Sequence, residues 1–242
     1  MTRRFRTILA FAGALALAVL LGAAFARTPA ATQVYLALAR PAGRAHETPN
    51  LVSSINFDLR ALDTLGEETI VAAAVVGTLS LLSLSPGERR RLNPDHRPVL
   101  PAVRIFGYVL LPITFLLGID VVLHGHLTPG GGFQGGVVLA TGWHLLYLAG
   151  DYPALARLRP IAWCEYAEAT GTGLYVVTGL AGLVAAGSFL TNFLPFGSWT
   201  ALPSAGTVPL LSFFVGVEVA AGFVVLLARF LEQGLLPDKE TA

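Results

Sequence analysis

Seven carboxylates and three histidines stand inside or at the ends of long apolar runs in this 242-residue sequence. A charged side chain within a bilayer costs free energy unless it is paired or hydrated, so an ionisable residue there is by default a functional-site hypothesis. Such side chains exchange protons, and carboxylates also bind cations. The sequence therefore predicts a protein that handles protons or cations. The residues concerned are Asp63, Glu67, Glu68, Asp120, Glu165, Glu168, Glu218, His124, His126 and His144.

Two of these residues lie within apolar runs rather than at their ends. Glu218 stands near the middle of the run 208–231, so we expect it in an ion path or in a contact between subunits. His144 lies in the run 133–149 and shares a helical face with Ala140 and Thr141. For His144 two interpretations stay open, a hydrogen-bonded packing residue, which the spacing favours, or a proton relay.

The polar stretch 50–67 precedes one of the apolar runs. Its aliphatic residues recur at spacings of four, four and three, which predicts one apolar face of a helix that lies along or dips into the membrane. Arg60, Asp63 and Glu67 recur at spacings of three and four on another face, so an Arg–carboxylate cluster is expected at the mouth of the next span. The cluster either admits protons or cations to a relay or is a structural ion pair that anchors the helix.

A second polar stretch, 124–136, reads His-Gly-His-Leu-Thr-Pro-Gly-Gly-Gly-Phe-Gln-Gly-Gly. Proline followed by three glycines cannot continue a helix and permits tight turns, and the last two glycines let the next helix start close against a neighbour. A Walker phosphate loop is excluded because it requires a Gly-Lys-Ser/Thr ending and the only lysine is Lys239. The residues of this structural motif are Pro129, Gly130, Gly131, Gly132, Phe133, Gly135 and Gly136.

Asp120, His124 and His126 surround the start of this stretch and are acceptable zinc or iron ligands. The loop offers no fourth ligand in sequence. Two other interpretations are capping and hydrogen bonding of the glycine loop, and proton handling by a histidine that titrates near neutral pH at a membrane interface. We predict no bound metal and no other cofactor.

Helices in a membrane must position these residues, because the chain is 54% hydrophobic and only 13% charged. The net charge of +1 excludes a basic nucleic-acid surface, and the single Cys164 excludes an intrachain disulfide framework and a cysteine-based metal site. Six apolar runs of spanning length predict an all-α, polytopic membrane protein with about six transmembrane helices. The runs are 8–25, 67–84, 99–123, 133–149, 167–190 and 208–231.

The distribution of the basic residues predicts the orientation, because arginine and lysine are retained on the cytoplasmic side. Placing both termini in the cytoplasm collects twelve of the sixteen basic residues there and leaves Arg27, Arg40, Arg44 and Arg60 in one long outer loop. An alternative for the run 8–25 is a cleaved signal peptide, since an arginine-rich start precedes it and Ala-Phe-Ala follows.

Both polar stretches resemble subunits of one family of complexes. The stretch from Asn50 through Asp-Leu-Arg-Ala-Leu-Asp-Thr-Leu-Gly-Glu67 is similar to the C-terminal part of the A subunit of Mrp-type multisubunit monovalent cation/proton antiporters and to the E subunit of membrane-bound hydrogenases. The stretch 124–136 resembles the hallmark of the B subunit, MnhB or MrpB. The resemblance implies two fused modules, an A/E-like module with two transmembrane helices (1–88) and a B-like module with four transmembrane helices (99–232). A basic cytoplasmic linker (89–98) joins them, and a cytoplasmic tail (233–242) follows.

The resemblance implies a multi-pass subunit of a Na+ (monovalent cation)/H+ antiporter complex in the cell (inner) membrane. We expect a scaffold with part of a hydrated ion path, inactive alone and not an enzyme. Implied partners are large A- and D-like pumping subunits, small C-, F- and G-like subunits, the lipid bilayer, Na+ or another monovalent cation, and H+, but no nucleic acid. The alternative is an ion-translocating subunit of a respiratory redox complex such as a membrane-bound hydrogenase. The path candidates are Arg60, Asp63, Glu67, Glu68, Asp120, His124, His126, His144 and Glu218.

Overall fold

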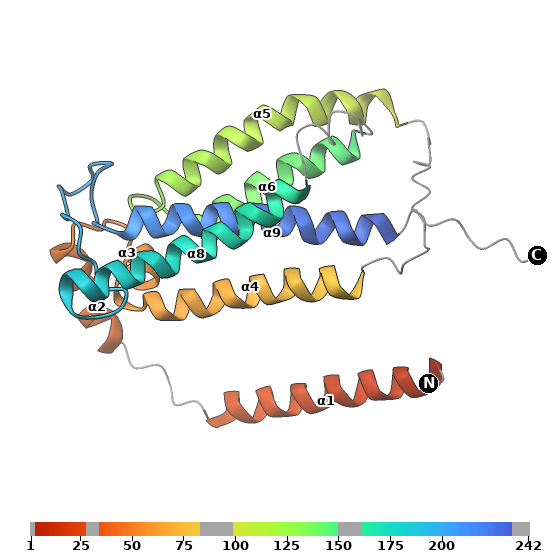
Figure 1. Ribbon diagram of the computed structural model, residues 1–242, viewed down its shortest axis with the longest axis horizontal. Helices are drawn as coiled ribbons and strands as arrows, with labels where there is room; N and C mark the ends of the chain where they lie inside the picture. Colours follow the sequence, from red (N-terminus) through yellow and green to blue (C-terminus); the bar gives the residue numbers. More distant parts are fainter. Residues whose placement is uncertain (1–2, 28–33, 83–98, 150–160, 234–242) are drawn as a thin grey trace, which may run out of the picture. The chain divides into compact units, whose positions relative to one another are not determined.

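The computed structural model describes residues 3–27, 34–82, 99–149 and 161–233, and all regular structure in these ranges is helical (Figure 1). The chain forms two units, 1–38 and 39–242. The helices are α1 (Arg3–Arg27), α2 (Val34–Ala45), α3 (Leu51–Ser54), the π-helix η1 (Ile55–Leu59), α4 (Ala61–Leu81), α5 (Pro101–Leu123), α6 (Gly132–Leu148), α8 (Ile161–Ala186) and α9 (Val208–Gln233).

Each of the six predicted apolar runs corresponds to a helix, so the all-α prediction is confirmed. Among the described residues, α4, α5, α8 and α9 are long and apolar enough to cross a membrane, and Phe11–Arg27 of α1 is a shorter apolar segment. The count of six spans and the cytoplasmic location of both termini stay predictions, as does the cleaved signal peptide. The predicted linker 89–98 and nearly all of the tail 233–242 lie outside the described residues.

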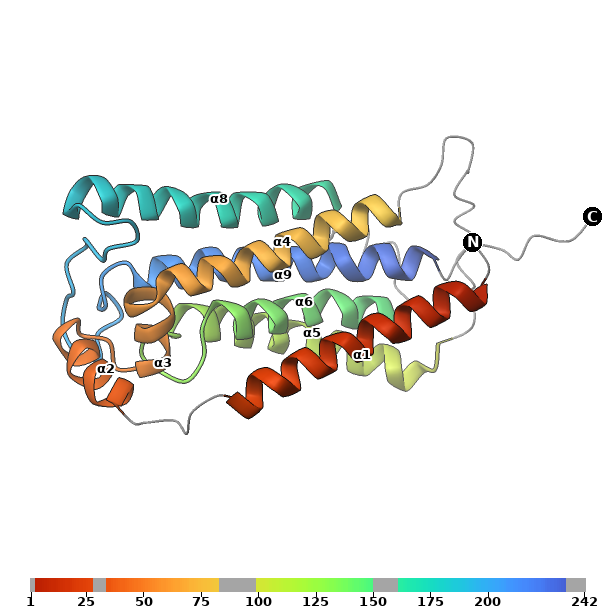
Figure 2. The ribbon, with the colours of Figure 1, turned by 90° about the horizontal axis from the view of Figure 1, so that it is seen from below.

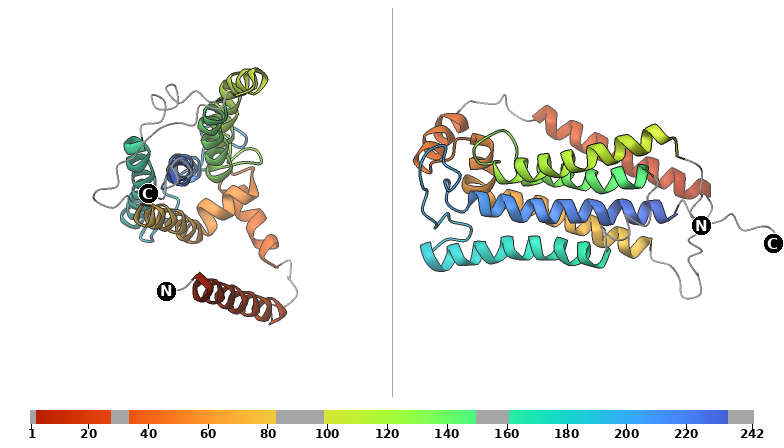
Figure 3. Two further views of the ribbon diagram at one scale, coloured as in Figure 1. Left: turned by 90° about the vertical axis from the view of Figure 1, so that its right-hand side faces the viewer. Right: turned by 90° about the horizontal axis from the view of Figure 1, so that it is seen from above.

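The larger unit is a bundle arranged around α9. Viewed along the bundle, α9 lies at the centre, with α4, α8 and the α5–α6 pair around it (Figure 3). Its buried face carries valine side chains with no exposed surface, among them Val215, Val219 and Val224. The connecting segments 46–50, 124–131 and 187–207 gather at one end of this bundle, which we call the loop end (Figure 2).

The single helical face predicted over 50–67 is wrong, because the chain changes its helical form twice there. The short α3 passes into η1, whose wider turn is closed by the Arg60 amide donating to the Ile55 carbonyl at 2.8 Å. Arg60 then leaves helical geometry, with φ −135° and ψ 36°, before α4 begins. The Thr64 hydroxyl satisfies the Asn56 carbonyl at 2.7 Å.

Glycines let α6 touch the backbone of α9. A Cβ on Gly132 would lie 2.3 Å from the carbonyl oxygen of Ser212, and one on Gly136 would lie 2.8 Å from Cβ of Val219. No side chain fits at these distances, so the two helices approach to backbone contact along their first turns. The close helix start predicted from the glycine-rich stretch is therefore observed.

We expect Gly132→Ala to lower the free energy of unfolding by about 1–3 kcal/mol, because the added methyl group overpacks a backbone contact. Thermal unfolding of the full chain in detergent measures the effect. Gly173→Ala in α8 is the matched control, since nothing lies within 4 Å of its Cβ position. Alanine is the better helix former, so this control should keep or raise the melting temperature. Equal melting temperatures for Gly132→Ala and wild type would contradict the close packing.

Candidate functional site

Three glutamates from three different helices are buried in the larger unit. Glu68 of α4 and Glu218 of α9 have no exposed surface, and Glu168 of α8 is 6% exposed. Glu218 lies within electrostatic reach of both other carboxyl groups. We call these residues the carboxylate cluster. Glu68 and Glu218 were predicted path residues, whereas Glu168 was noticed only as an acid near a span end.

Glycines again set the distances between the helices at this cluster. A Cβ on Gly171 of α8 would lie 2.8 Å from Cβ of Glu218, so the backbone of α8 passes directly beside this glutamate. A Cβ on Gly222 of α9 would lie 3.6 Å from Cγ of Glu168. Each helix therefore offers a glycine where its neighbour carries an acid, and the acids are held between helix backbones.

The cluster is staggered along the bundle. Gly171 of α8 is level with Glu218, and Gly222 of α9 is level with Glu168, so Glu168 lies about one helical turn farther from the loop end than Glu218 does. Beyond Glu168, Arg229 Nη2 pairs with Glu165 Oε1 at 3.0 Å. Carboxyl groups thus occur at successive depths across the bundle.

Glu68 and Glu218 are direct neighbours, with side chains within hydrogen-bonding reach of each other. Their four carboxyl oxygens are buried, and no basic side chain in the described part of the chain pairs with them. The Thr172 hydroxyl also lies within hydrogen-bonding reach of Glu218. Two negative charges this close and this far from water would repel strongly. The pair is therefore suited to share a proton or to take up a cation.

Polar groups continue from Glu68 toward the loop end. The buried Tyr175 side chain lies within electrostatic reach of Glu68, and its hydroxyl donates to the Ala61 carbonyl at 2.9 Å. Its hydroxyl also lies near that of Thr64, which bonds to η1. These groups connect the first buried carboxyl with the π-helix, and π-helical turns occur frequently at functional sites.

At the start of α4 the structure brings together part of the predicted Arg–carboxylate cluster. Arg60 Nη2 and Asp63 Oδ2 form an ion pair, and both side chains are more than half exposed. Glu67 is exposed, although it follows on the same stretch and directly precedes the buried Glu68. Exposed pairs contribute little to stability. This pair lies at the loop end, before the buried part of α4.

The three residues considered as metal ligands are not assembled. Asp120 Oδ1 lies 2.8 Å from His124 Nδ1. His126 turns away, with Nε2 2.9 Å from the Leu202 carbonyl of the segment 187–207. Among the described residues, no group of three His, Cys, Asp or Glu side chains is placed to hold a metal ion. His144, the remaining histidine candidate, is half-buried on α6, which carries no member of the carboxylate cluster.

His126 is held as a neutral ring. A carbonyl only accepts, so Nε2 carries the proton, and the buried Nδ1 has no hydrogen-bond partner in the described chain. Burial lowers the pKa of His126 below its ordinary value of 6.5, against the opposing hydrogen bond to Leu202. The side chain is 1% exposed and fastens one loop-end segment to another.

The two family-like stretches are joined at Asn50. Its side-chain amide donates to the carbonyls of Gly125 at 2.7 Å and Thr128 at 2.8 Å, and its backbone amide donates to the His126 carbonyl at 3.0 Å. The Ser53 hydroxyl donates to the same Gly125 carbonyl at 2.5 Å. The start of the first stretch is therefore built into the loop of the second.

The glycine-rich loop supports this junction. Gly131 has φ 143°, in the region that favours glycine, and a Cβ on Gly125 would lie 2.5 Å from its Cα. Pro129 is exposed at the bend, and the partly buried Phe133 packs against the hydrophobic core around α9. The predicted structural motif thus forms a tight turn from α5 into α6.

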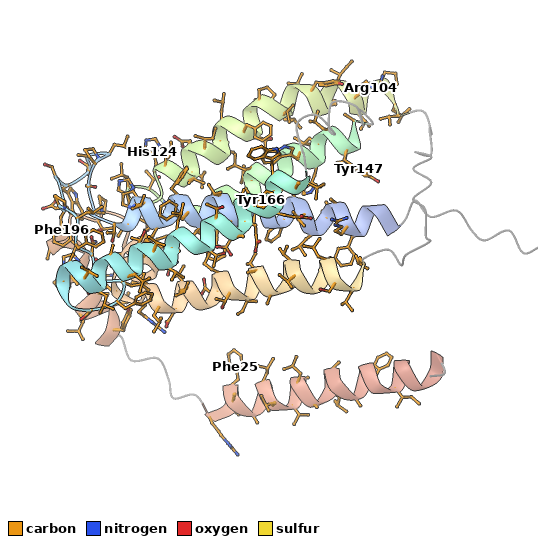
Figure 4. The ribbon with its side chains drawn as sticks, viewed as in Figure 1. Phe25, Arg104, His124, Tyr147, Tyr166 and Phe196 are labelled. Atoms are coloured by element: carbon orange, nitrogen blue, oxygen red, sulfur yellow. The ribbon has the colours of Figure 1, made fainter. Side chains whose placement is uncertain are left out.

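A buried acid outside the predicted set lies at the loop end. Asp58 Oδ2 of η1 and His46 Nδ1 are 2.5 Å apart, and the Asp58 side chain is 4% exposed. The His46 ring stacks on Phe196, with centroids 4.3 Å apart and planes at 11°. Phe196 and His124 mark this end of the bundle, and Arg104 and Tyr147 the other (Figure 4). Asp58 belongs to the first family-like stretch, and its place in that stretch was the sequence signal that could have identified it as a candidate residue.

Comparison with known proteins places these features in a family. Residues 102–225 match a domain related to the MnhB subunit of Na+/H+ antiporter. MJ1307, an uncharacterized protein of Methanocaldococcus jannaschii, is 31% identical over 198 residues, 72% of this chain and 74% of that protein. The probable K(+)/H(+) antiporter A/B subunit of Rhizobium meliloti is 27% identical over 74% of this chain and 20% of its own length.

Two solved structures share the fold. A chain of the Mrp complex from Dietzia sp. DQ12-45-1b matches all of this chain and 27% of its own, with 27% identity and a TM-score of 0.65. A chain of the membrane-bound sulfane sulfur reductase, an archaeal respiratory membrane complex, matches 94% of this chain and 98% of its own, with 25% identity and a TM-score of 0.66.

The neutral His126 predicts acid-sensitive stability. Because its native pKa is lowered, its contribution is fully present above pH 6.5 and is lost as the pH falls from 6.5 through the lowered native value. Melting temperatures of the full chain in detergent across this range measure the loss. His126→Gln keeps a donor for Leu202 and should flatten the dependence, while the neighbouring His124→Gln should retain it. An unchanged slope in His126→Gln would refute this role.

Proposed function

Because the chain belongs to the family of the domain related to the MnhB subunit of Na+/H+ antiporters, we propose that it is a membrane subunit of a multisubunit monovalent cation/proton antiporter. The chain is a multi-pass membrane protein. In the complex it is a scaffold and supplies part of a hydrated ion or proton path. It catalyses no reaction of its own and does not transport alone.

The proposal includes a fusion of two neighbouring subunit types within this chain. The MnhB-related match begins at residue 102, so it leaves the preceding A- or E-like stretch unaccounted for. Two observations support the fusion: the similarity to an A/B antiporter protein and the full coverage of this chain by part of one Mrp-complex chain. The module boundaries 1–88, 89–98, 99–232 and 233–242 belong to this proposal. The four bonds from Asn50 and Ser53 to the 124–128 loop join the two modules at the loop end, beside the packing of α4 against α8 and α9.

The observation that carries the ion-handling role is the facing pair of buried carboxyl groups, Glu68 and Glu218, which have no basic partner among the described residues. A proton that reaches Glu68 is passed to Glu218 and then to Glu168, which lies deeper along the bundle. Arg60, Asp63 and Glu67 form the exposed mouth at the loop end. Water between the groups completes the relay, since the acids stand on three separate helices.

The remaining candidates have supporting places in this proposal. The Asp120–His124 pair and His126 hold the glycine-rich loop and, with it, the starts of α6 and α9. His144 is a half-buried packing residue of α6. The partners are the large A- and D-like pumping subunits and the small C-, F- and G-like subunits, in the cell (inner) membrane. Na+ or another monovalent cation and H+ are the transported ions.

A second candidate function follows from the similarity to a chain of the sulfane sulfur reductase, whose whole length is nearly covered. In that case the same carboxylates belong to an ion-translocating subunit of a redox-driven complex. Copurification with iron–sulfur or nickel-bearing subunits distinguishes this function from an antiporter. The buried carboxylate path serves both, because only the source of driving energy differs.

We expect Glu68→Gln and Glu218→Gln each to reduce cation/proton exchange to the level of vesicles without the complex. The amide keeps the size of the side chain but does not exchange protons near neutral pH. The measurement uses the complete set of subunit genes in cells that lack their own antiporters, with pH-sensitive dye fluorescence in everted vesicles after addition of Na+ or K+.

Glu47→Gln is the matched control, since it makes the same chemical change in a loop and should leave exchange intact. Assembly of each variant complex is checked by affinity purification. Full exchange by assembled Glu68→Gln and Glu218→Gln complexes would reject the path and leave only the scaffold.

A further inference from the structure

A basic groove opens at the loop end of the larger unit. Its volume is about 560 Å³, and its lining combines Arg40 and Arg44 of α2 with Trp199 of the segment 187–207. Pro41, Pro49 and Leu51 supply apolar walls, and no acidic side chain of the described residues lines it. The groove is separate from the carboxylate cluster, which is buried between α4, α8 and α9.

The two arginines of the groove are uncompensated. They stand four residues apart on α2, so their guanidinium groups lie on one helical face and repel each other. Neither forms an ion pair with any residue in the described part of the chain. Both side chains are exposed. An anion in the groove would relieve this repulsion and accept hydrogen bonds from both.

The backbone holds the groove in shape. A Cβ on Gly43, which also lines the groove, would lie 3.2 Å from Ser54 Oγ, so α2 is seated closely against α3 at the floor of the groove. The buried Thr48 hydroxyl donates to the His46 carbonyl at 3.1 Å and fixes the turn between the two helices. The opposite wall is fastened by the stacking of His46 on Phe196, three residues before Trp199.

The place of the groove at the end of the apolar helices is where we expect the lipid headgroups. It lies at the end of the bundle where α4 begins and α8 ends, next to the apolar lengths of these spans. Trp199 is 44% exposed, and tryptophan is enriched at the membrane–water interface. Arg40 and Arg44 are two of only four basic residues that the predicted topology leaves outside the cytoplasm, where arginine is otherwise avoided.

We propose that this groove binds the phosphate group of an anionic phospholipid. The two guanidinium groups hold the phosphate oxygens, for which their planar donor pairs are suited. The glycerol and the start of the acyl chains lie against Leu51 and the two prolines. The bound lipid fastens α2 to the segment 187–207 at the membrane surface.

Native mass spectrometry of the full chain released from detergent tests the proposal, with phosphatidylglycerol, phosphatidylcholine and inorganic phosphate as probes. Phosphatidylglycerol should bind more tightly than phosphatidylcholine. Arg40→Gln/Arg44→Gln should weaken its binding about tenfold or more, as expected for the loss of charged hydrogen bonds. A single Arg44→Gln should weaken it more than Arg60→Gln, which removes the same charge at the same end outside the groove.

Three results would overturn the proposal. The first is equal affinity for phosphatidylglycerol and phosphatidylcholine in wild type, and the second is unchanged phosphatidylglycerol binding by the folded double variant. The third is binding of inorganic phosphate at this site without a preference for the anionic lipid, which would assign the groove to free phosphate. Melting temperatures confirm that each variant is folded, and Arg40→Lys/Arg44→Lys, which keeps the charge, should retain part of the binding.

Discussion

The backbone contact between α9 and the helices around it is the constraint on which the rest of the larger unit depends. It exists because glycines stand where side chains would collide: Gly132 and Gly136 of α6 against α9, and Gly171 of α8 beside Glu218. In a bilayer, lipid tails are as apolar as the helix surfaces, so close packing replaces the hydrophobic effect as the source of helix association. The positions of Glu218 and Glu168 follow from these contacts.

The same contacts explain how acids can be buried at membrane depth. No lysine or arginine of the described residues pairs with Glu218, and its ionisable neighbours are two other carboxyl groups, those of Glu68 and Glu168. Burying two neighbouring carboxyl groups costs free energy, which a purely structural role does not explain. The cost is understandable if the pair takes up and releases a proton or cation, with Glu168 of α8 as the next carboxyl group along the bundle.

Much of the fold was predictable from sequence, since long apolar runs specify helices and a Pro-Gly-rich stretch specifies a turn followed by close packing. The break between α3, η1 and α4 was not, because nothing in the spacing of the aliphatic residues marks the change to a π-helix at Ile55–Leu59. The pairing of Asp120 with His124 follows from their helical spacing. Glu168 joins Glu218 only through tertiary packing, and His46 meets Asp58 across a change of helix type, so periodicity contains no signal for either.

Cross-linking of positions 68 and 218 in native membranes tests the central claim most directly. The chain has one cysteine, so Cys164→Ser provides a clean background for Glu68→Cys with Glu218→Cys, treated with a short bifunctional thiol reagent. The account predicts an efficient intramolecular link between these positions, identified by peptide mass spectrometry. It predicts little for Thr69→Cys with Glu218→Cys, because the side chain of Thr69 is exposed. Efficient linking from position 69, or none from position 68 in an assembled complex, would contradict it.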